Sequence, residues 1–241
     1  MQLGFIGLGT MGRPMARHLI GAGHALAVFA RREDAMQPLV EAGAVACATP
    51  AVVAEQSDIT FTMVTGTADV EQVVLGDDGL IHGARAGTLV IDMSTIDPSA
   101  TRDISRTLAE SGVDMLDAPV SGGPQGARDA SLTIMVGGPE RAVERARPLF
   151  DVLGDSSTHM GEAGAGQTTK ACNQLAILVT AQGVAEALTL ARCSGRDPER
   201  ARAAAGPLGC EAIQWDEIPA REHDVLVNAT PLGSAAAPDQ S

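Results

Sequence analysis

Lys170 is the only lysine among 241 residues, and the other 16 of the 17 basic side chains are arginines. A partly desolvated lysine releases and regains a proton, whereas an arginine keeps its proton at any working pH. Asn173 follows three residues later, which on a helix places both polar side chains on one face. The stretch around them, residues 164–195, is apolar on nearly every side, as in a buried helix. The pair is therefore a candidate catalytic site, and the alternative is a lysine that reaches from a core helix to solvent.

A glycine pattern follows the first predicted strand, residues 2–6. Gly7, Gly9 and Gly12 form a GxGxxG motif that opens a predicted helix over residues 12–20. In this context the glycines permit a tight turn, close approach of the backbone to a pyrophosphate, and close packing of the helix on the strand. The helix N-terminus offers unpaired N–H groups to the phosphates. A second strand over residues 25–29 completes the pattern, which predicts a dinucleotide site at Gly7, Leu8, Gly9, Thr10, Met11 and Gly12.

The residues after the second strand bear on which dinucleotide binds. NAD sites usually carry an acid there for the ribose 2′-hydroxyl, whereas NADP sites tend to have an arginine nearby. Here Arg31 and Arg32 follow Ala30, and the first acid is Glu33. Because two guanidinium groups suit a 2′-phosphate, the sequence predicts NADP as the cofactor, with NAD as the alternative. A solvated arginine pair without a ligand is the simpler explanation.

Helices and strands alternate through the first 160 residues. Helices are predicted over residues 33–42, 50–56, 67–75, 98–111 and 139–153, and strands near residue 45 and over 59–64, 88–93, 113–117 and 132–136. This alternation predicts an α/β fold with a Rossmann-type, doubly wound and mostly parallel sheet, followed by a long interdomain helix.

Ligand contacts in such a sheet cluster at the carboxyl ends of the strands. Further candidates stand at these ends: Met63, Val64 and Thr95 for the cofactor, and Ser121, Gly122 and Gly123 for the substrate. A hydroxyl beside backbone N–H groups without side chains suits a small carboxylate. A plain turn also uses Gly-Gly-Pro, so the alternative is a turn without a ligand.

Composition restricts the partners and the compartment. The net charge of −13 argues against nucleic acid and against an anionic membrane surface. The four cysteines are scattered without a CxxC pair or a histidine at metal spacing, which predicts a reduced, cytoplasmic protein with no metal site. No apolar run approaches the roughly 18 residues of a spanning helix, and a strand that begins by residue 3 leaves no room for a signal peptide. The expected partner is a small molecule held by local donors.

Four segments stand in a distinctive order: GFIGLGTMGRPMARHL at residues 4–19, DAPVSGGPQGA at 117–127, LTIMVGG at 132–138 and GAGQTTKACNQ at 164–174. Their order and spacing resemble the 3-hydroxyacid dehydrogenase family, which includes 3-hydroxyisobutyrate dehydrogenase and tartronate semialdehyde (2-hydroxy-3-oxopropionate) reductase. The resemblance covers about residues 1–195. It implies hydride transfer between NAD(P)H and a small 3-hydroxy acid or its semialdehyde.

The resemblance also implies a role for each candidate side chain. Lys170 would be the catalytic proton donor, and Asn173 would orient the substrate. Residues 121–123 would hold the substrate carboxylate, and Thr95 would lie by the nicotinamide. Asn173 followed by Gln174 is closer to the tartronate semialdehyde and glyoxylate reductase branch than to the hydroxyisobutyrate branch, which tends to Asn-Asn.

After residue 195 the sequence departs from the family pattern, which continues with a helical domain that carries much of the dimer contact. Residues 196–233 instead resemble an internal piece of the shikimate dehydrogenase cofactor domain, mainly through DVLVNATPLG at 224–233. The expected organisation is a cofactor domain over 1–162 and a long helix over 163–195 that begins a truncated helical domain. The shikimate dehydrogenase-like segment over 196–233 and a disordered tail over 234–241 would follow.

Two functions follow from this organisation. The first is an enzyme in which NADPH reduces a semialdehyde carbonyl and Lys170 protonates the forming alkoxide. The second is a truncated or fused NADP-binding module with little or no turnover. In either case each large apolar side chain left in water on the 167–193 helix forfeits roughly 1.5–3 kcal/mol of burial, which predicts a homo-oligomer formed through this helix.

Overall fold

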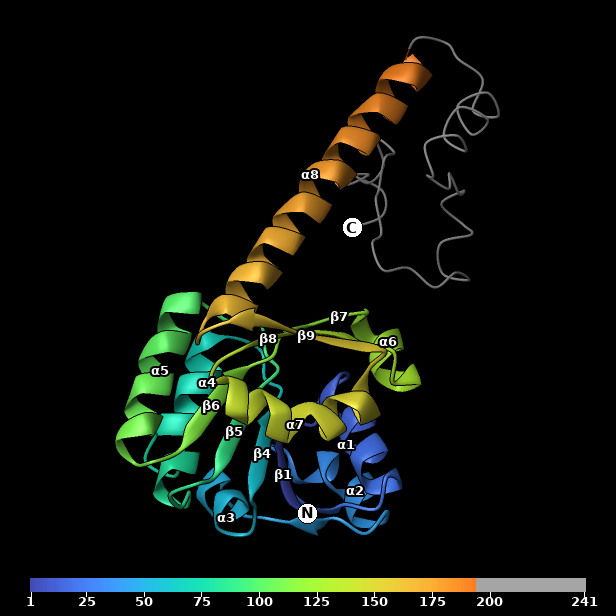
Figure 1. Cartoon of the computed structure of the whole chain (residues 1–241). Helices are drawn as coiled ribbons and strands as arrows, with labels where there is room; N and C mark the ends of the chain where they lie inside the picture. Colours follow the sequence, from blue (N-terminus) through green and yellow to red (C-terminus); the bar gives the residue numbers. More distant parts are fainter. Residues whose placement is uncertain (194–241) are drawn as a thin grey trace. The chain divides into compact units, whose positions relative to one another are not determined.

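The computed structural model in Figure 1 describes the backbone of residues 1–193 and the side chains of residues 1–187. The chain divides into two compact units, residues 1–171 and 172–241. The last described helix, α8 (Ala165–Cys193), begins in the first unit and continues into the second. The predictions for residues 196–233 and 234–241 lie outside the described residues, and a domain boundary at residue 162 stays a prediction.

One sheet forms the centre of the first unit. Its strands in the described chain are β1 (Gln2–Ile6), β2 (Ala25–Phe29), β3 (Val45–Ala46), β4 (Ile59–Thr62), β5 (Leu89–Asp92), β6 (Asp114–Asp117), β7 (Val120–Ser121), β8 (Thr133–Gly137) and β9 (Ser156–Gly161). They lie in the order β3-β2-β1-β4-β5-β6-β8-β7, with β9 beside β8. The pairs from β3 to β6 are parallel, whereas β8 runs antiparallel to β6 and β7. The predicted Rossmann-type, mostly parallel sheet is confirmed.

Helices cover both faces of this sheet (Figure 1). On one face lie α1 (Gly12–Gly21), α2 (Gln37–Val40), α6 (Gly123–Asp129) and α7 (Glu140–Leu153), and on the other α3 (Pro50–Glu55), α4 (Thr67–Leu75) and α5 (Pro98–Glu110). Side chains of a strand alternate between the faces, so Leu89 and Ile91 of β5 join the first core while Val90 joins the second. Because helices cover both faces, nearly every residue of the central strands β4, β5 and β6 is buried.

The structure differs from the predicted elements in three places. The expected helix over residues 33–42 is a 3₁₀ turn, Glu33–Ala35, followed by the short α2. Pro38 lies in the first turn of α2, where its missing N–H is tolerated, so a continuous helix through this point is disfavoured. The short β7 and α6 lie in the stretch 120–129, for which no strand or helix was predicted. Strand β9 was not predicted because its sequence SSTHMG is polar and mostly exposed.

Polar residues form a row at the carboxyl ends of three central strands. Thr62, Asp92 and Asp117 are register neighbours in β4, β5 and β6. Asp92 is completely buried, and its Oδ1 accepts hydrogen bonds from the Thr62 hydroxyl at 2.7 Å and from the Ser94 N–H at 3.1 Å. Its Oδ2 has no hydrogen-bond partner within the described chain. Burial therefore raises the pKa of the Asp92 carboxyl above its ordinary value.

Asp117 has donors at both oxygens. The Gly164 N–H donates to Oδ1 and the Gln167 N–H donates to Oδ2, each at 2.8 Å, so the carboxylate satisfies the first turn of α8. Burial raises the pKa of Asp117, and the backbone donors act in the opposite direction. The start of α8 is thereby fixed to the end of β6.

The described residues contain no helix that is both long and apolar enough to cross a membrane. They also contain no group of three or more His, Cys, Asp or Glu side chains placed to hold a metal ion. Cys47 is a buried free thiol and Cys172 an exposed one, whereas Cys193 and Cys210 lie outside the described side chains.

We expect opposite results when each of the two aspartates is changed to asparagine. Asp117→Asn removes one acceptor from two backbone donors and should lower the free energy of unfolding by about 1–3 kcal/mol. Asp92→Asn keeps the acceptor at Oδ1 and resembles the neutral acid, so its stability should equal or exceed that of the wild type. Urea unfolding monitored by circular dichroism measures both changes.

The effect of Asp92→Asn should depend on pH in one direction. Because the folded-state pKa is raised, the stability of the neutral acid is fully present below the ordinary value of 3.8 and is lost as pH rises through the folded-state pKa. The advantage of the asparagine variant should therefore grow with pH above 3.8. Equal destabilisation by the two substitutions at neutral pH would contradict this account of Asp92.

Candidate functional site

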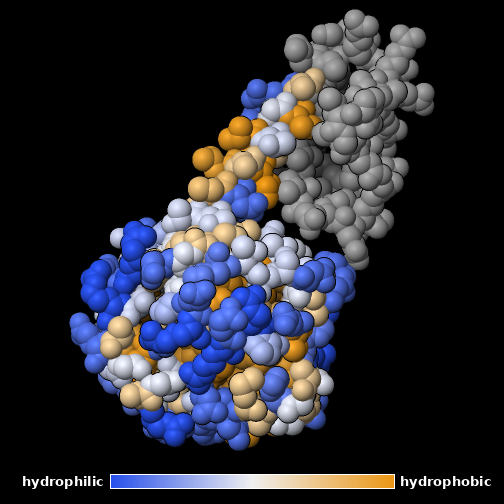
Figure 2. Space-filling view, in the orientation of Figure 1, coloured by the Kyte–Doolittle hydropathy of each residue, from blue (hydrophilic) through white to orange (hydrophobic). Residues whose placement is uncertain are grey.

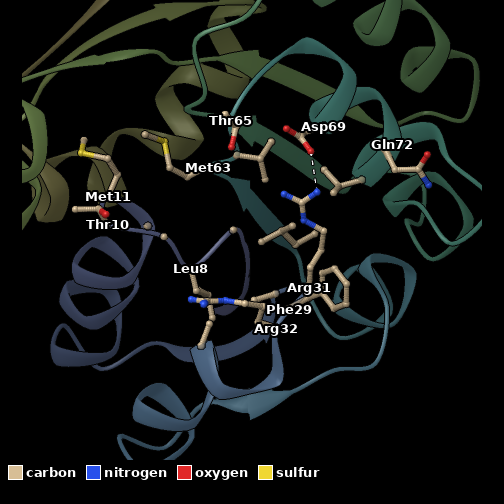
Figure 3. Close-up of a pocket in the computed structure, with 18 residues that line it drawn as sticks. Leu8, Thr10, Met11, Phe29, Arg31, Arg32, Met63, Thr65, Asp69 and Gln72 are labelled. Atoms are coloured by element: carbon tan, nitrogen blue, oxygen red, sulfur yellow. Dashed lines mark ion pairs between the residues drawn. The ribbon is translucent and has the colours of Figure 1, made fainter. Parts of the chain in front are cut away.

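A cavity of about 410 Å³ lies at the carboxyl ends of β1, β2 and β4 (Figure 3). In the strand order, β1 has β2 on one side and β4 on the other, so the chain reverses its direction of winding here. Ligands of open α/β sheets bind at such a switch point. The cavity is lined by these predicted cofactor residues: Gly7, Leu8, Gly9, Thr10, Met11, Gly12, Arg31, Arg32, Met63 and Val64.

The three glycines of the loop after β1 occupy different environments, so each is required for a different reason. Gly7 has φ +95°, and a Cβ there would lie 2.2 Å from the Met63 carbonyl oxygen. A Cβ on Gly12 would lie 1.9 Å from the Gly7 carbonyl oxygen. A Cβ on Gly9 would meet no atom within 4 Å, although Gly9 lines the cavity. Gly7 and Gly12 are thus required by packing, whereas Gly9 keeps the cavity wall free of a side chain.

The N-terminus of α1 faces this loop. No side chain caps it, because the residue at the cap position, Met11, makes no side-chain hydrogen bond to the helix. The Arg13 N–H donates to the Gly9 carbonyl at 3.1 Å, and Pro14 has no N–H, so the Gly12 N–H is the helical donor without an acceptor in the described chain and is suited to a phosphate oxygen. The open loop and the uncapped helix fit the pyrophosphate of a dinucleotide.

The two arginines after β2 both reach the cavity. The Arg31 and Arg32 side chains are 80% and 76% exposed, and each pairs with an acid. Arg31 Nη1 lies 3.2 Å from Asp69 Oδ1, whereas Arg32 Nε lies 3.8 Å from Asp34 Oδ1. Asp69 comes from the first turn of α4 and also lines the cavity. Asp69 could not be predicted from the sequence, because nothing in the local pattern of α4 indicates a contact with the end of β2.

The predicted substrate and catalytic residues do not line this cavity, and neither does Thr95, which was predicted to bind the cofactor. Thr95 is exposed after β5, Ser121 ends β7, and Lys170 lies in α8. Gln167 connects two of these places. Its Oε1 accepts from the Ile96 N–H at 3.1 Å, and its Nε2 donates to the Ser94 carbonyl at 2.7 Å, so one buried amide binds the backbone on both sides of Thr95.

Lys170 follows Gln167 by three residues on α8. It is 8% exposed, and no ion pair or hydrogen bond holds its ammonium within the described chain. Burial lowers the pKa of the Lys170 ammonium below its ordinary value, which makes it a better proton donor. A lysine that extends freely into solvent does not fit this burial.

Asn173 lies in the second unit, on the continuation of α8. It is half-buried, and its Nδ2 donates to Gln174 Oε1 at 3.5 Å. Lys170 and Asn173 thus lie on one continuous helix, as the sequence predicted.

Known proteins resemble this chain over the sheet and the cavity. Residues 2–161 match the family described as the NAD binding domain of 6-phosphogluconate dehydrogenase. The chain is 47% identical over 204 residues to 2-hydroxy-3-oxopropionate reductase of Escherichia coli, covering 85% of this chain and 70% of that protein. It is 41% identical over 197 residues to 3-hydroxyisobutyrate dehydrogenase of Pseudomonas aeruginosa, covering 82% and 66%.

A solved structure of a relative has a similar fold. The fold resembles Mycobacterium tuberculosis 3-hydroxyisobutyrate dehydrogenase with L-serine, with a TM-score of 0.80 and 34% identity over 88% of this chain and 72% of that one. The chain thus spans about two-thirds of the length of these relatives. Because the relatives are named as reductases and dehydrogenases, the comparisons favour an enzyme over a nucleotide-binding module with little turnover. The chain belongs to the 3-hydroxyacid dehydrogenase family of NAD(P)-dependent oxidoreductases.

Proposed function

We propose that this chain interconverts a small semialdehyde carboxylate and its 3-hydroxy acid, with 2-hydroxy-3-oxopropionate as the favoured substrate and NADP as the favoured cofactor. The observation that carries the proposal is Lys170, a buried lysine whose ammonium has no counter-ion in the described chain, on the helix that Gln167 holds beside Thr95 by two hydrogen bonds. The 47% identity to the Escherichia coli reductase supports the choice of substrate.

The cofactor is held by residues of three loops. Backbone N–H groups of residues 7–12 bind the pyrophosphate, and Met63 and Val64 form part of the cavity wall. Arg31 and Arg32 bind the 2′-phosphate by charge-assisted hydrogen bonds, which favours NADP over NAD. When bound, the dinucleotide supplies the hydride that reduces the carbonyl carbon.

The substrate is held by residues that do not line the dinucleotide cavity. Ser121, Gly122 and Gly123 bind its carboxylate, Thr95 lies by the nicotinamide, and Asn173 orients the reacting group. The family motifs at residues 117–127 and 164–174 support these roles. The mycobacterial relative was solved with L-serine, which is itself a small 3-hydroxy acid.

Lys170 is the general acid of the reduction. As the carbonyl carbon accepts hydride, the carbonyl oxygen becomes an alkoxide, and the Lys170 ammonium donates the proton that makes it a hydroxyl. In the reverse direction the neutral amine takes this proton back. The lowered pKa favours both transfers, because an ordinary lysine would hold its proton too firmly.

We also propose that two copies of this chain associate through α8, in the cytoplasm, where the thiols stay reduced. Leu175, Leu178 and Val179 are 63–65% exposed. Figure 2 shows hydrophobic residues on the surface of α8, whereas the visible surface of the first unit is largely hydrophilic. Burial of each such side chain contributes roughly 1.5–3 kcal/mol to association. Leu188 lies outside the described side chains.

Gly9→Val should abolish dinucleotide binding without unfolding the protein. A Cβ at residue 9 meets no protein atom within 4 Å, and residue 9 lines the cavity, so the added side chain should occupy the space that the pyrophosphate must approach. Calorimetric titration with NADPH measures the loss, and the thermal unfolding midpoint tests the fold. Gly21→Val is the matched control, because Gly21 belongs to α1, has open space around it and does not line the cavity. Unchanged NADPH affinity in Gly9→Val would mean that the pyrophosphate binds elsewhere.

Lys170→Arg should lower turnover by about 10²–10⁴-fold while the affinity for NADPH changes little, because guanidinium keeps its proton. In the wild type, reduction should slow as pH rises through the lowered pKa of Lys170, since the ammonium is the donor. The arginine variant should lack this part of the pH profile. Steady-state oxidation of NADPH with 2-hydroxy-3-oxopropionate measures both effects. Turnover close to that of the wild type would remove Lys170 from the chemistry.

The oligomer should depend on the apolar side chains of α8. Sedimentation velocity at micromolar concentration is expected to give a dimer for the wild type and a monomer for the Leu175→Ser, Leu178→Ser double variant. Val45→Ser is the control, because Val45 is a comparably exposed apolar residue outside α8. A wild-type monomer under these conditions would contradict association through α8.

A further inference from the structure

We propose that Asp69 sets the balance between NADPH and NADH by competing with the ribose 2′-phosphate for Arg31. The inference deepens the proposed function and rests on its assignment of Arg31 to the 2′-phosphate. It identifies an acid that raises the use of NADH in a site whose arginines favour NADPH. The substrate and the catalytic lysine are not involved.

The contact brings together two elements that are distant in sequence. Arg31 follows β2, and Asp69 lies in the first turn of α4, yet Arg31 Nη1 is 3.2 Å from Asp69 Oδ1. Both residues line the cavity, and Figure 3 shows their side chains meeting there. A guanidinium that pairs with this carboxylate points at the acid and not at a ligand.

The position of Asp69 in α4 favours its negative charge independently of Arg31. It is the acidic residue in the first turn of α4, where a negative charge interacts favourably with the helix dipole. The cap residue of α4, Gly66, offers no side chain that would take over this role. Asp69 is also the more buried partner, at 33% exposure against 80% for Arg31. The acid is therefore the fixed member of the pair, and the arginine is the mobile one.

The two cofactors meet this pair differently. A 2′-phosphate must draw Arg31 away from Asp69 and is repelled by the carboxylate, since like charges disfavour each other at short range. A ribose 2′-hydroxyl carries no charge, and a carboxylate near the end of β2 is the usual acceptor for it. Asp69 thus supplies from α4 the acid that the sequence lacks after β2.

Arg32 is not restrained in the same way. Its nearest acid, Asp34, lies 3.8 Å away, is 74% exposed and does not line the cavity. Arg32 is therefore available to a 2′-phosphate in any case, and the choice between cofactors depends on Arg31. This difference makes Asp69, and not Asp34, the residue that determines specificity.

The test is a double-mutant cycle with Asp69→Asn, Arg31→Met and the double variant in the full chain. Dissociation constants of NADPH and NADH are measured for each by nicotinamide fluorescence at low and high salt. Asp69→Asn should raise the preference for NADPH roughly two- to fivefold, the range set by an exposed ion pair. The gain should be smaller at high salt and absent in the Arg31→Met background.

Asp58→Asn is the control. It removes a carboxylate that pairs with Arg85 at 3.9 Å, just before β4 and outside the cavity, so the ratio of the two affinities should not change. An unchanged ratio in Asp69→Asn, or weaker NADPH binding, would overturn the competition while leaving the proposed function intact. Arg31→Met decides the proposed function separately. If it weakens NADPH and NADH equally, Arg31 does not bind the 2′-phosphate, and both the competition and the assignment of Arg31 in the proposed function are wrong.

Discussion

The buried carboxylate of Asp117 is the contact on which the position of the proposed catalytic residue, Lys170, depends. It accepts the N–H groups of Gly164 and Gln167 and so fixes the first turn of α8 to the end of β6. The Gln167 side chain then binds the backbone on both sides of Thr95. Since Lys170 lies one turn further on α8, its position relative to the sheet follows from backbone donors and a single amide. The flexible Lys170 side chain is thereby attached to a helix whose start is held rigidly on the sheet.

The two buried carboxyl groups in this region differ in their effect on the stability of the sheet. Asp92 and Asp117 are register neighbours and almost fully buried, and only Asp117 has donors at both oxygens. The strands below this row are apolar on both faces. The row of Thr62, Asp92 and Asp117 therefore places buried polar groups where apolar packing would be more stable. Such departures from apolar packing are expected near functional regions.

The sequence predicted the parts of the site that follow one another along the chain. The loop over residues 7–12 and the arginines after β2 were found because a strand, a glycine pattern and a second strand give a local signal. Asp69 and Gln167 were missed, because their partners lie far away in the sequence and become neighbours only when the sheet is assembled, across strands that are not adjacent in it. The same limit applies to β9, whose place depends on pairing with β8 and not on its own apolar pattern.

The open space around Gly9 has a consequence for descendants of this chain. Substitutions at Gly7 or Gly12 displace backbone atoms and are eliminated by loss of folding, whether or not a dinucleotide is needed. A Cβ at Gly9 meets no protein atom within 4 Å, so selection against a small side chain there comes from the ligand. A lineage that stopped using its cofactor would therefore change at Gly9 while keeping its neighbours. A homologue with that pattern would be a folded protein that has lost its enzymatic role.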